Sequence, residues 1–135
     1  MKSLLFAAAA ALALAGQASP GFASQTGSPT FTIVPLSTHV AVVTSKPGCN
    51  AEAAFNGTPY YEVPEIASAM GIGGTSAVKI DLASNGDLLS ASLFQSSGNR
   101  WLDDAAMRSA KLSRYIPETI DCHQVAGSYL LDVDF

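Results

Sequence analysis

The sequence predicts an α+β fold, with a small antiparallel sheet of about three strands and two helices on one face. Two segments with a period of two flank an Asn-Gly pair, which indicates a β-hairpin. A segment with helical spacing follows the hairpin, and a third alternating segment closes the chain. The expected order is helix, strand, strand, helix, strand, and the helices should pack on one face of the sheet.

The hairpin is the clearest local prediction. Residues 75–83 and 88–95 alternate between apolar and polar side chains, and Asn85-Gly86 between them tolerates the positive φ angles of a tight turn. On the first strand the apolar face carries Val78, Ile80 and Leu82. On the second strand the side chains expected to face the core are Leu89, Ala91 and Leu93.

Two helices are expected, one on each side of the hairpin. Pro64 suits the first turn of a helix over residues 64–70, and Gly71 can end it. Its inward side chains are expected to be Ile66, Ala67 and Met70. The second helix is expected over residues 102–114, where small and apolar side chains share one face.

The two ends of the chain supply the remaining extended segments. Residues 128–135 alternate and predict the last strand of the sheet. Residues 30–44 are rich in β-branched side chains but are interrupted at Pro35, so they predict one or two extended pieces. This pattern leaves room for an extra N-terminal strand, whereas residues 49–58 lack a period and are expected to form a loop.

The first residues are typical of a secretory signal peptide. Lys2 precedes an apolar run that is too short for a transmembrane helix, which needs about 20 residues. Small residues favour cleavage after Ala23, and cleavage after Ala18 is the alternative. We expect a signal peptide at 1–23, a flexible N-terminal extension and loop at 24–58, and one domain at 59–135. The chain would then be periplasmic, or anchored in the inner membrane if the segment is not cleaved.

Charge and cysteine content narrow the range of functions. The formal net charge is −4 and no cluster of Lys or Arg occurs, so neither nucleic acid nor lipid is an expected partner. In an oxidising compartment Cys49 and Cys122 would form one disulfide, which closes a long loop and contributes roughly 4 kcal/mol. The alternative is a metal site at Cys122-His123, but adjacent ligands are sterically awkward and no second pair has zinc-like spacing.

The residue types used in catalysis do not form a recognisable set, so neither enzymatic activity nor a cofactor is expected. Ser96-Ser97-Gly98 lacks the Gly-x-Ser-x-Gly pattern of a nucleophile elbow. His39 and His123 have no nucleophile beside them in the sequence. Asp103-Asp104 is explained by the positive end of the second helix, because adjacent helical residues point apart.

Several short motifs follow one another in a fixed order from Tyr60 to Phe135. They are Pro64-x-x-Ala67-x-x-x-Gly71-x-x-Gly74, Asn85-Gly86, Ser96-Ser97-Gly98-x-x-x-Leu102-Asp103-x-Ala105-Ala106, Ser113-Arg114-Tyr115-x-Pro117 and Gly127-Ser128-Tyr129. Each motif alone is weak, but the ordered set resembles the TonB C-terminal domain family. One departure is Val63-Pro64, where the family usually carries Tyr-Pro; nearby Tyr60 and Tyr61 are candidates for that aromatic role.

The resemblance implies a module that binds a partner along its last strand. In this family an extended segment of an outer-membrane transporter pairs with that strand. An open sheet edge presents unpaired N–H and C=O groups, which a partner satisfies by strand addition. The partner-binding residues implied here are Gly127, Ser128, Tyr129, Leu130, Leu131, Asp132, Val133 and Asp134.

Two other functions stay open at this point. An open edge also allows self-association, which would give a homodimer or a structural module of the envelope without a transport role. An envelope enzyme with unrecognised chemistry ranks last. Energising members of the family also carry an N-terminal membrane helix and a proline-rich spacer, but the 7 prolines here are scattered, so we expect only the docking half.

Overall fold

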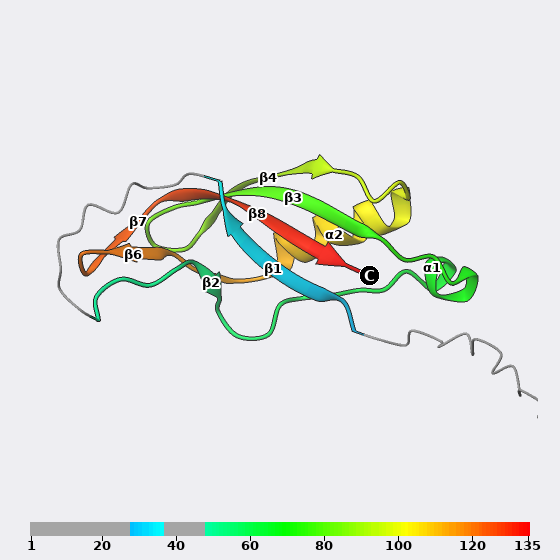
Figure 1. Ribbon diagram of the computed structural model, residues 1–135, viewed down its shortest axis with the longest axis horizontal. Coiled ribbons are helices and arrows are strands. Elements are labelled where there is room, and N and C mark those ends of the chain that lie inside the picture. Colours follow the sequence, from blue (N-terminus) through cyan, green and yellow to red (C-terminus); the bar gives the residue numbers. More distant parts are fainter. Residues whose placement is uncertain (1–27, 37–47) are drawn as a thin grey trace, which may run out of the picture.

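The main sheet consists of four antiparallel strands. The structure is a computed structural model that describes residues 28–36 and 48–135. From one border to the other (Figure 1), the strands are β1 (Thr30–Pro35), β8 (Gly127–Asp134), β3 (Thr75–Leu82) and β4 (Leu88–Gln95). The sequence predicts the last three of these strands, and β1 is the extra N-terminal strand for which it leaves room.

Two small antiparallel pairs form separate sheets beside the main one. β2 (Ala54–Phe55) pairs with β5 (Tyr115–Ile116), and β6 (Glu118–Ile120) pairs with β7 (His123–Val125). β2 lies in the stretch expected to be loop, and β1 also precedes the expected domain boundary. The described parts of the segment 24–58 therefore contribute strands to the fold.

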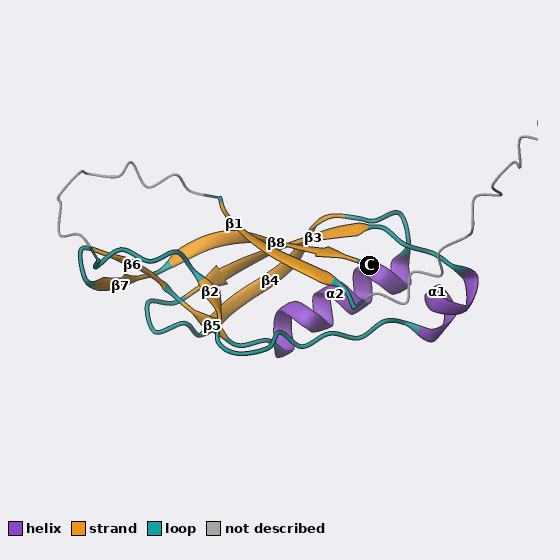
Figure 2. Ribbon diagram, turned by 60° about the horizontal axis from the view of Figure 1, so that its bottom comes forward, coloured by secondary structure: helices purple, strands orange, loops and turns teal. Residues whose placement is uncertain are grey.

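The longer helix covers one face of the main sheet. α2 (Arg100–Leu112) lies against the sheet (Figure 2). It begins two residues earlier than expected because Asn99 Oδ1 accepts a hydrogen bond from the N–H of Trp101 at 3.0 Å and caps the helix. Trp101 itself stays largely exposed, whereas Leu102 is fully buried.

The core forms between α2 and one face of the main sheet, chiefly β3 and β8, and Tyr115 of β5 joins it. Small side chains on α2 let the helix approach the sheet closely, and large apolar side chains on the strands fill the space between them. The fully or nearly fully buried members of this cluster are Val78, Ile80, Leu82, Ala106, Ala110, Tyr115, Tyr129, Leu131 and Val133.

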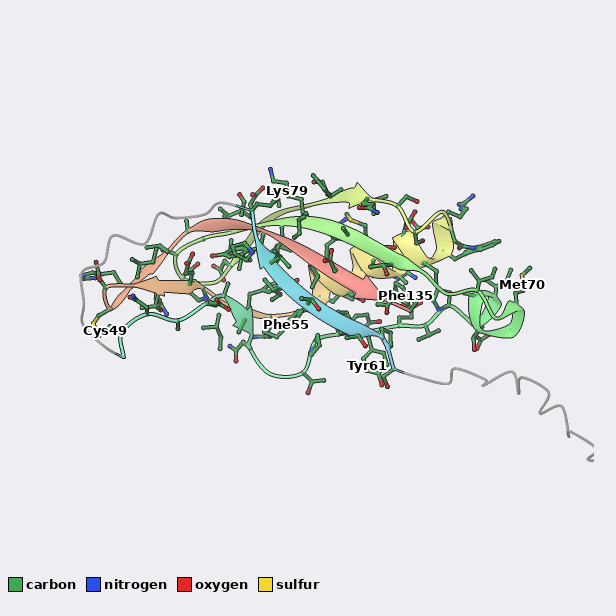
Figure 3. The ribbon with its side chains drawn as sticks, viewed as in Figure 1. Cys49, Phe55, Tyr61, Met70, Lys79 and Phe135 are labelled. Atoms are coloured by element: carbon green, nitrogen blue, oxygen red, sulfur yellow. A yellow bond between two sulfur atoms is a disulfide. The ribbon has the colours of Figure 1, made fainter. Side chains whose placement is uncertain are left out.

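The short helix lies at the end of the sheet rather than on its face. α1 (Glu65–Met70) stands beside the start of β3 (Figures 1 and 2). Of the three side chains expected to point inward, only Ala67 is buried. Ile66 is exposed, and Met70, 64% exposed, projects from the far end of the molecule (Figure 3). The expectation for these two is wrong because the helix has only six residues and is anchored by Ala67 alone.

The hairpin forms as predicted, but β4 contains two irregularities. Its pairing with β3 shifts register near each end, which leaves Leu89 and Phe94 without a directly opposed residue. Leu88 and Ala91 pack against the core, whereas Leu89 is 67% exposed. Leu93 is also largely exposed at the sheet border. The expectation that Leu89 faces the core is wrong, because a register shift beside it interrupts the period of two. Leu93 lies opposite the buried Val78, on the expected face, but stays exposed because it is at the sheet border.

The predicted disulfide between Cys49 and Cys122 is present, and it lies at the opposite end of the molecule from α1 (Figure 3). Cys122 and Asp121 form the turn between β6 and β7, with φ angles of 68° and 50°. Such turns favour Gly or Asn, because other residues are strained at positive φ. The strained turn is held by the disulfide and by Asn50 Oδ1, which accepts from the N–H of Asp121 at 2.8 Å.

A buried carboxylate ties α2 to the sheet. Asp103, 8% exposed, accepts hydrogen bonds at Oδ1 from Ser76 Oγ of β3 at 2.8 Å and from the N–H of Ser97 at 2.8 Å. The hydroxyls of Ser96 and Ser97 donate to it as well. Burial raises the pKa of Asp103, but these donors together outweigh burial and hold the pKa below its ordinary value.

Several expected features lie outside the described residues. They include the signal peptide at 1–23, the extended pieces around Val40, Val42 and Val43, and His39. In the part of the chain that the structure describes, neither helix has the length and apolar character needed to cross a membrane.

Truncating the centre of the core should destabilise the fold strongly. Leu131 is fully buried between the sheet and α2, so Leu131→Ala should lower the free energy of unfolding by about 2–5 kcal/mol in urea titrations. Leu89→Ala makes the same change at an exposed bulge and should cost under about 0.5 kcal/mol. Equal losses for the two variants would contradict the assignment of the core.

Removing the charge of Asp103 should lower stability in a pH-dependent way. Asp103→Asn should cost about 1.5–3 kcal/mol near neutral pH. The folded pKa lies below the unfolded value of about 3.9, so the carboxylate stabilises the fold above that value and this contribution is lost as pH falls through the folded pKa.

The free-energy difference between wild type and Asp103→Asn should therefore shrink in urea titrations repeated from about pH 6 down to about pH 3. Asp104→Asn, at the exposed neighbouring carboxylate, is the matched control and should have a much smaller effect. A difference that stays constant over this range would refute the proposed role of Asp103.

Candidate partner-binding strand

The eight residues predicted to bind a partner form β8, which is an interior strand. β3 pairs with it along its full length on one side. On the other side β1 pairs with it from Thr30 opposite Asp134 to Pro35 opposite Tyr129. The expectation that β8 forms an open edge is therefore wrong in this structure. Its outward N–H and C=O groups face another strand of the same chain.

The side chains of β8 alternate between two environments. Tyr129, Leu131 and Val133 face α2 and are buried. On the opposite face, in order along the strand, lie Ser128, Leu130, Asp132 and Asp134. The first set maintains the core, so only the second set and the main chain are available to a partner.

Gly127 and Tyr129 depend on each other at the start of β8. A Cβ atom at Gly127 would lie 2.6 Å from the hydroxyl oxygen of Tyr129, so only glycine leaves room for this ring. The hydroxyl of Tyr129 donates to Glu118 Oε2 at 3.3 Å. Burial raises the pKa of Tyr129, and the negative charge of Glu118 raises it further. Both residues are thus explained by packing.

A second carboxylate connects three strands on the open face of the sheet. Asp81 of β3 accepts hydrogen bonds from Ser128 Oγ of β8 and from Ser90 Oγ of β4. These bonds, Ser128 first, hold the pKa of Asp81 below its ordinary value, and Lys79 Nζ at 4.0 Å contributes a smaller share. Ser128 therefore helps to fix the register of β8 on β3.

The two acidic residues of β8 differ in their surroundings. Asp134 accepts a hydrogen bond from Thr75 Oγ1 at 2.8 Å. Asp132 lies between Thr32 of β1 and Ala77 of β3 and has no side-chain hydrogen bond or ion pair within residues 28–36 and 48–135. Its carboxylate is thus available to pair with a partner's cation, whereas one oxygen of Asp134 is already hydrogen-bonded to Thr75.

β1 covers β8 with only partly buried side chains. Phe31 lies opposite Val133 and Ile33 opposite Leu131, both on the core face. The ring of Phe31 meets the edge of Phe55, with centroids 5.8 Å apart. Val34 is exposed on the other face.

Among residues 28–36 and 48–135, the borders of the sheet without a further strand are β4 and the outer side of β1. On β4, Leu89 and Phe94 (60% exposed) lie at the two irregularities of the strand. Sequence reasoning misses this surface, because alternation assigns side chains to faces and does not reveal a bulge. The short apolar stretch Leu93-Phe94 was the available signal, since strict alternation would put a polar residue at one of these positions.

The residues weighed as catalytic have structural roles or stand alone. Ser96, Ser97 and Asp103 form the network that joins α2 to β3. His123 is exposed on β7. Among the described residues no group of His, Cys, Asp and Glu side chains could hold a metal ion. The arrangement is suited to main-chain pairing between strands.

Comparison with known proteins identifies one family. Residues 59–135 match the family model described as Gram-negative bacterial TonB protein C-terminal. The chain has no match among curated proteins or among solved structures. Domains of this family bind proteins of the cell envelope, in general outer-membrane transporters. Since the matched segment makes up more than half of the chain and contains β3, β4, β8 and both helices, the protein belongs to the TonB C-terminal domain family.

Proposed function

We propose that this domain docks an extended segment of an outer-membrane transporter by strand addition to β8, in the periplasm. The residues that would form the contact are the main chain of Gly127–Asp134 and the side chains of its open face. Such docking would serve transmembrane transport, because the family is that of the TonB energy transducer. No chemistry beyond reversible binding is involved.

The observation that carries this proposal is the origin of β1. The family match begins at residue 59, whereas β1 covers residues 30–35. Within the matched segment the sheet has the order β8-β3-β4, so β8 is its border. β1 is therefore a strand from outside the matched domain that is added to β8, and its presence supports β8 as a border that accepts such strands.

The physical basis of docking is main-chain hydrogen bonding. The main-chain N–H and C=O groups on the outer side of β8 need hydrogen-bond partners. An extended segment docked beside β8 would supply them. Affinity would come from these bonds, and selectivity from side chains at alternate positions. Docking at β8 requires β1 to leave, because both strands need the same main-chain groups.

Self-association through β4 is the second candidate function. This border exposes Leu89, Leu93 and Phe94, and exposed apolar side chains on an edge strand favour pairing with another chain. Pairing of two copies along β4 would leave β1 and β8 undisturbed, so the two functions predict changes at opposite borders of the sheet.

Peptide titration distinguishes the two functions. A synthetic extended segment of an outer-membrane transporter, added to the isotope-labelled oxidised protein, should shift the backbone amide NMR signals of residues 127–134 and 30–35. The variant Phe94→Ser should bind the segment with unchanged affinity, since Phe94 lies on the far border. Docking at β8 would be excluded by shifts confined to residues 88–95, especially if they appear on concentrating the protein without peptide and vanish in Phe94→Ser.

A further inference from the structure

We propose that β1 is an internal occupant of the docking border and that its sequence specifies the partner. The partner is an extended segment antiparallel to β8, with an aromatic and a branched aliphatic residue two positions apart on one face and a cation on the other. This inference rests on the proposed function of β8, and it adds the chemistry of the partner and a competitor that controls access.

The direction and register of the partner follow from β1. The N–H of Leu36 donates to the carbonyl of Ser128 at 3.0 Å. Because hydrogen-bonded and non-hydrogen-bonded pairs alternate along an antiparallel ladder, Thr30, Thr32 and Val34 also direct their main-chain groups to β8. Pro35 falls at a position whose missing N–H would face the free border, so it costs no bond to β8.

The apolar preference follows from the side chains that β1 places over the core. Leu131 and Val133 of β8 are fully buried, and Ile33 and Phe31 lie directly opposite them. Phe31 also meets Phe55, whose ring centroid lies 5.5 Å from that of Tyr115. A partner must cover the same surface, so it needs an aromatic residue at the position of Phe31 and a branched aliphatic residue at that of Ile33.

The preference for a cation follows from the open face. Asp132 lies opposite Thr32, and no side chain of the described residues forms a hydrogen bond or ion pair with it. The hydroxyl of Thr32 does not compensate this charge. A Lys or Arg at that position would form a directly opposed charge pair, whereas an acidic residue would be repelled.

β1 also limits access to the border. Phe31 and Ile33 are only half-buried, and Thr32, Val34 and Pro35 are exposed, so the side chains of β1 hold it less firmly than buried side chains hold β8. A partner binds only the fraction of molecules in which β1 has left, and its apparent dissociation constant rises accordingly. Weakening β1 without altering β8 should therefore strengthen binding in trans.

A competition experiment tests this inference. The probe is a labelled synthetic peptide of residues 28–36, added to the full oxidised chain and to its variant Thr32→Pro. Proline removes a main-chain donor that faces β8 but leaves Phe31 and Ile33 in place. The peptide should bind Thr32→Pro at least about tenfold more tightly than wild type, with shifts along residues 127–134. The matched control Thr32→Val keeps the N–H and should behave as wild type.

The charge preference is tested with two variants of the probe. A peptide carrying Thr32→Lys should bind about two- to fivefold more tightly than the parent, and one carrying Thr32→Glu should bind more weakly. High salt should reduce both differences, and Asp132→Asn in the protein should abolish them. Peptides that bind equally at low salt would refute the predicted cation.

Two further outcomes keep the inference falsifiable. If Thr32→Pro does not fold, hydrogen exchange on the wild type is measured instead. The amides that bond β1 to β8 should exchange by local opening, faster than the amides that bond β8 to β3. Equal protection of the two sets, or equal peptide binding by wild type and Thr32→Pro, would overturn the inference.

The inference and the proposed function fail in different ways. Binding of the β1 peptide to Thr32→Pro without binding of any transporter segment would refute only the proposed function. A transporter segment that shifts the signals of residues 127–134, while the parent, Thr32→Lys and Thr32→Glu peptides all bind equally, would refute only the inference.

Discussion

The structure depends on the pairing of β8 with β3, which places the buried face of β8 against α2. This strand contributes three buried side chains to the core and shares main-chain groups with β3 and β1. α2 can lie close to it because Ala106 and Ala110 are small. The strand in the middle of the sheet is thus the last in the sequence, and β1 reaches it from about a hundred residues earlier. Contacts this distant in sequence raise the contact order of the fold and are expected to slow its folding, because the intervening loop must be closed.

Local features of the fold could be predicted from the sequence, because local interactions determine them. The hairpin follows from alternation and Asn85-Gly86, and α2 from helical spacing; the disulfide follows from there being one cysteine pair. The position of β1 could not be predicted in the same way. Alternation around Phe31 and Ile33 indicates a strand, but which strand becomes its neighbour depends on the packing of distant segments.

The remaining differences have separate physical causes. Bulges in β4 shift Leu89 out of the core, and a helix as short as α1 buries only Ala67. Asp103 was explained by the helix dipole, whereas the structure adds three serines that solvate its carboxylate in place of water. For the candidate site, the sequence identified the strand but not its second neighbour. That neighbour lies outside the segment that carries the family motifs.

The extra strand changes the character of the domain's border. An uncovered β8 would expose Leu131 and Val133 beside unpaired main-chain groups, which favours unselective pairing between chains. β1 prevents this by covering the border with the protein's own residues. The opposite border has no such cover among the described residues, and β4 instead has the bulges that commonly protect an edge strand.

The disulfide limits how far a detached β1 could move from β8. Cys49 is fixed to the β6–β7 turn, and 12 residues separate it from Leu36. A chain of that length spans at most about 45 Å, so a detached β1 stays near β8 at a local concentration on the order of millimolar. If β1 leaves β8 as proposed, this connection would return it to β8 when the partner dissociates, without an external factor.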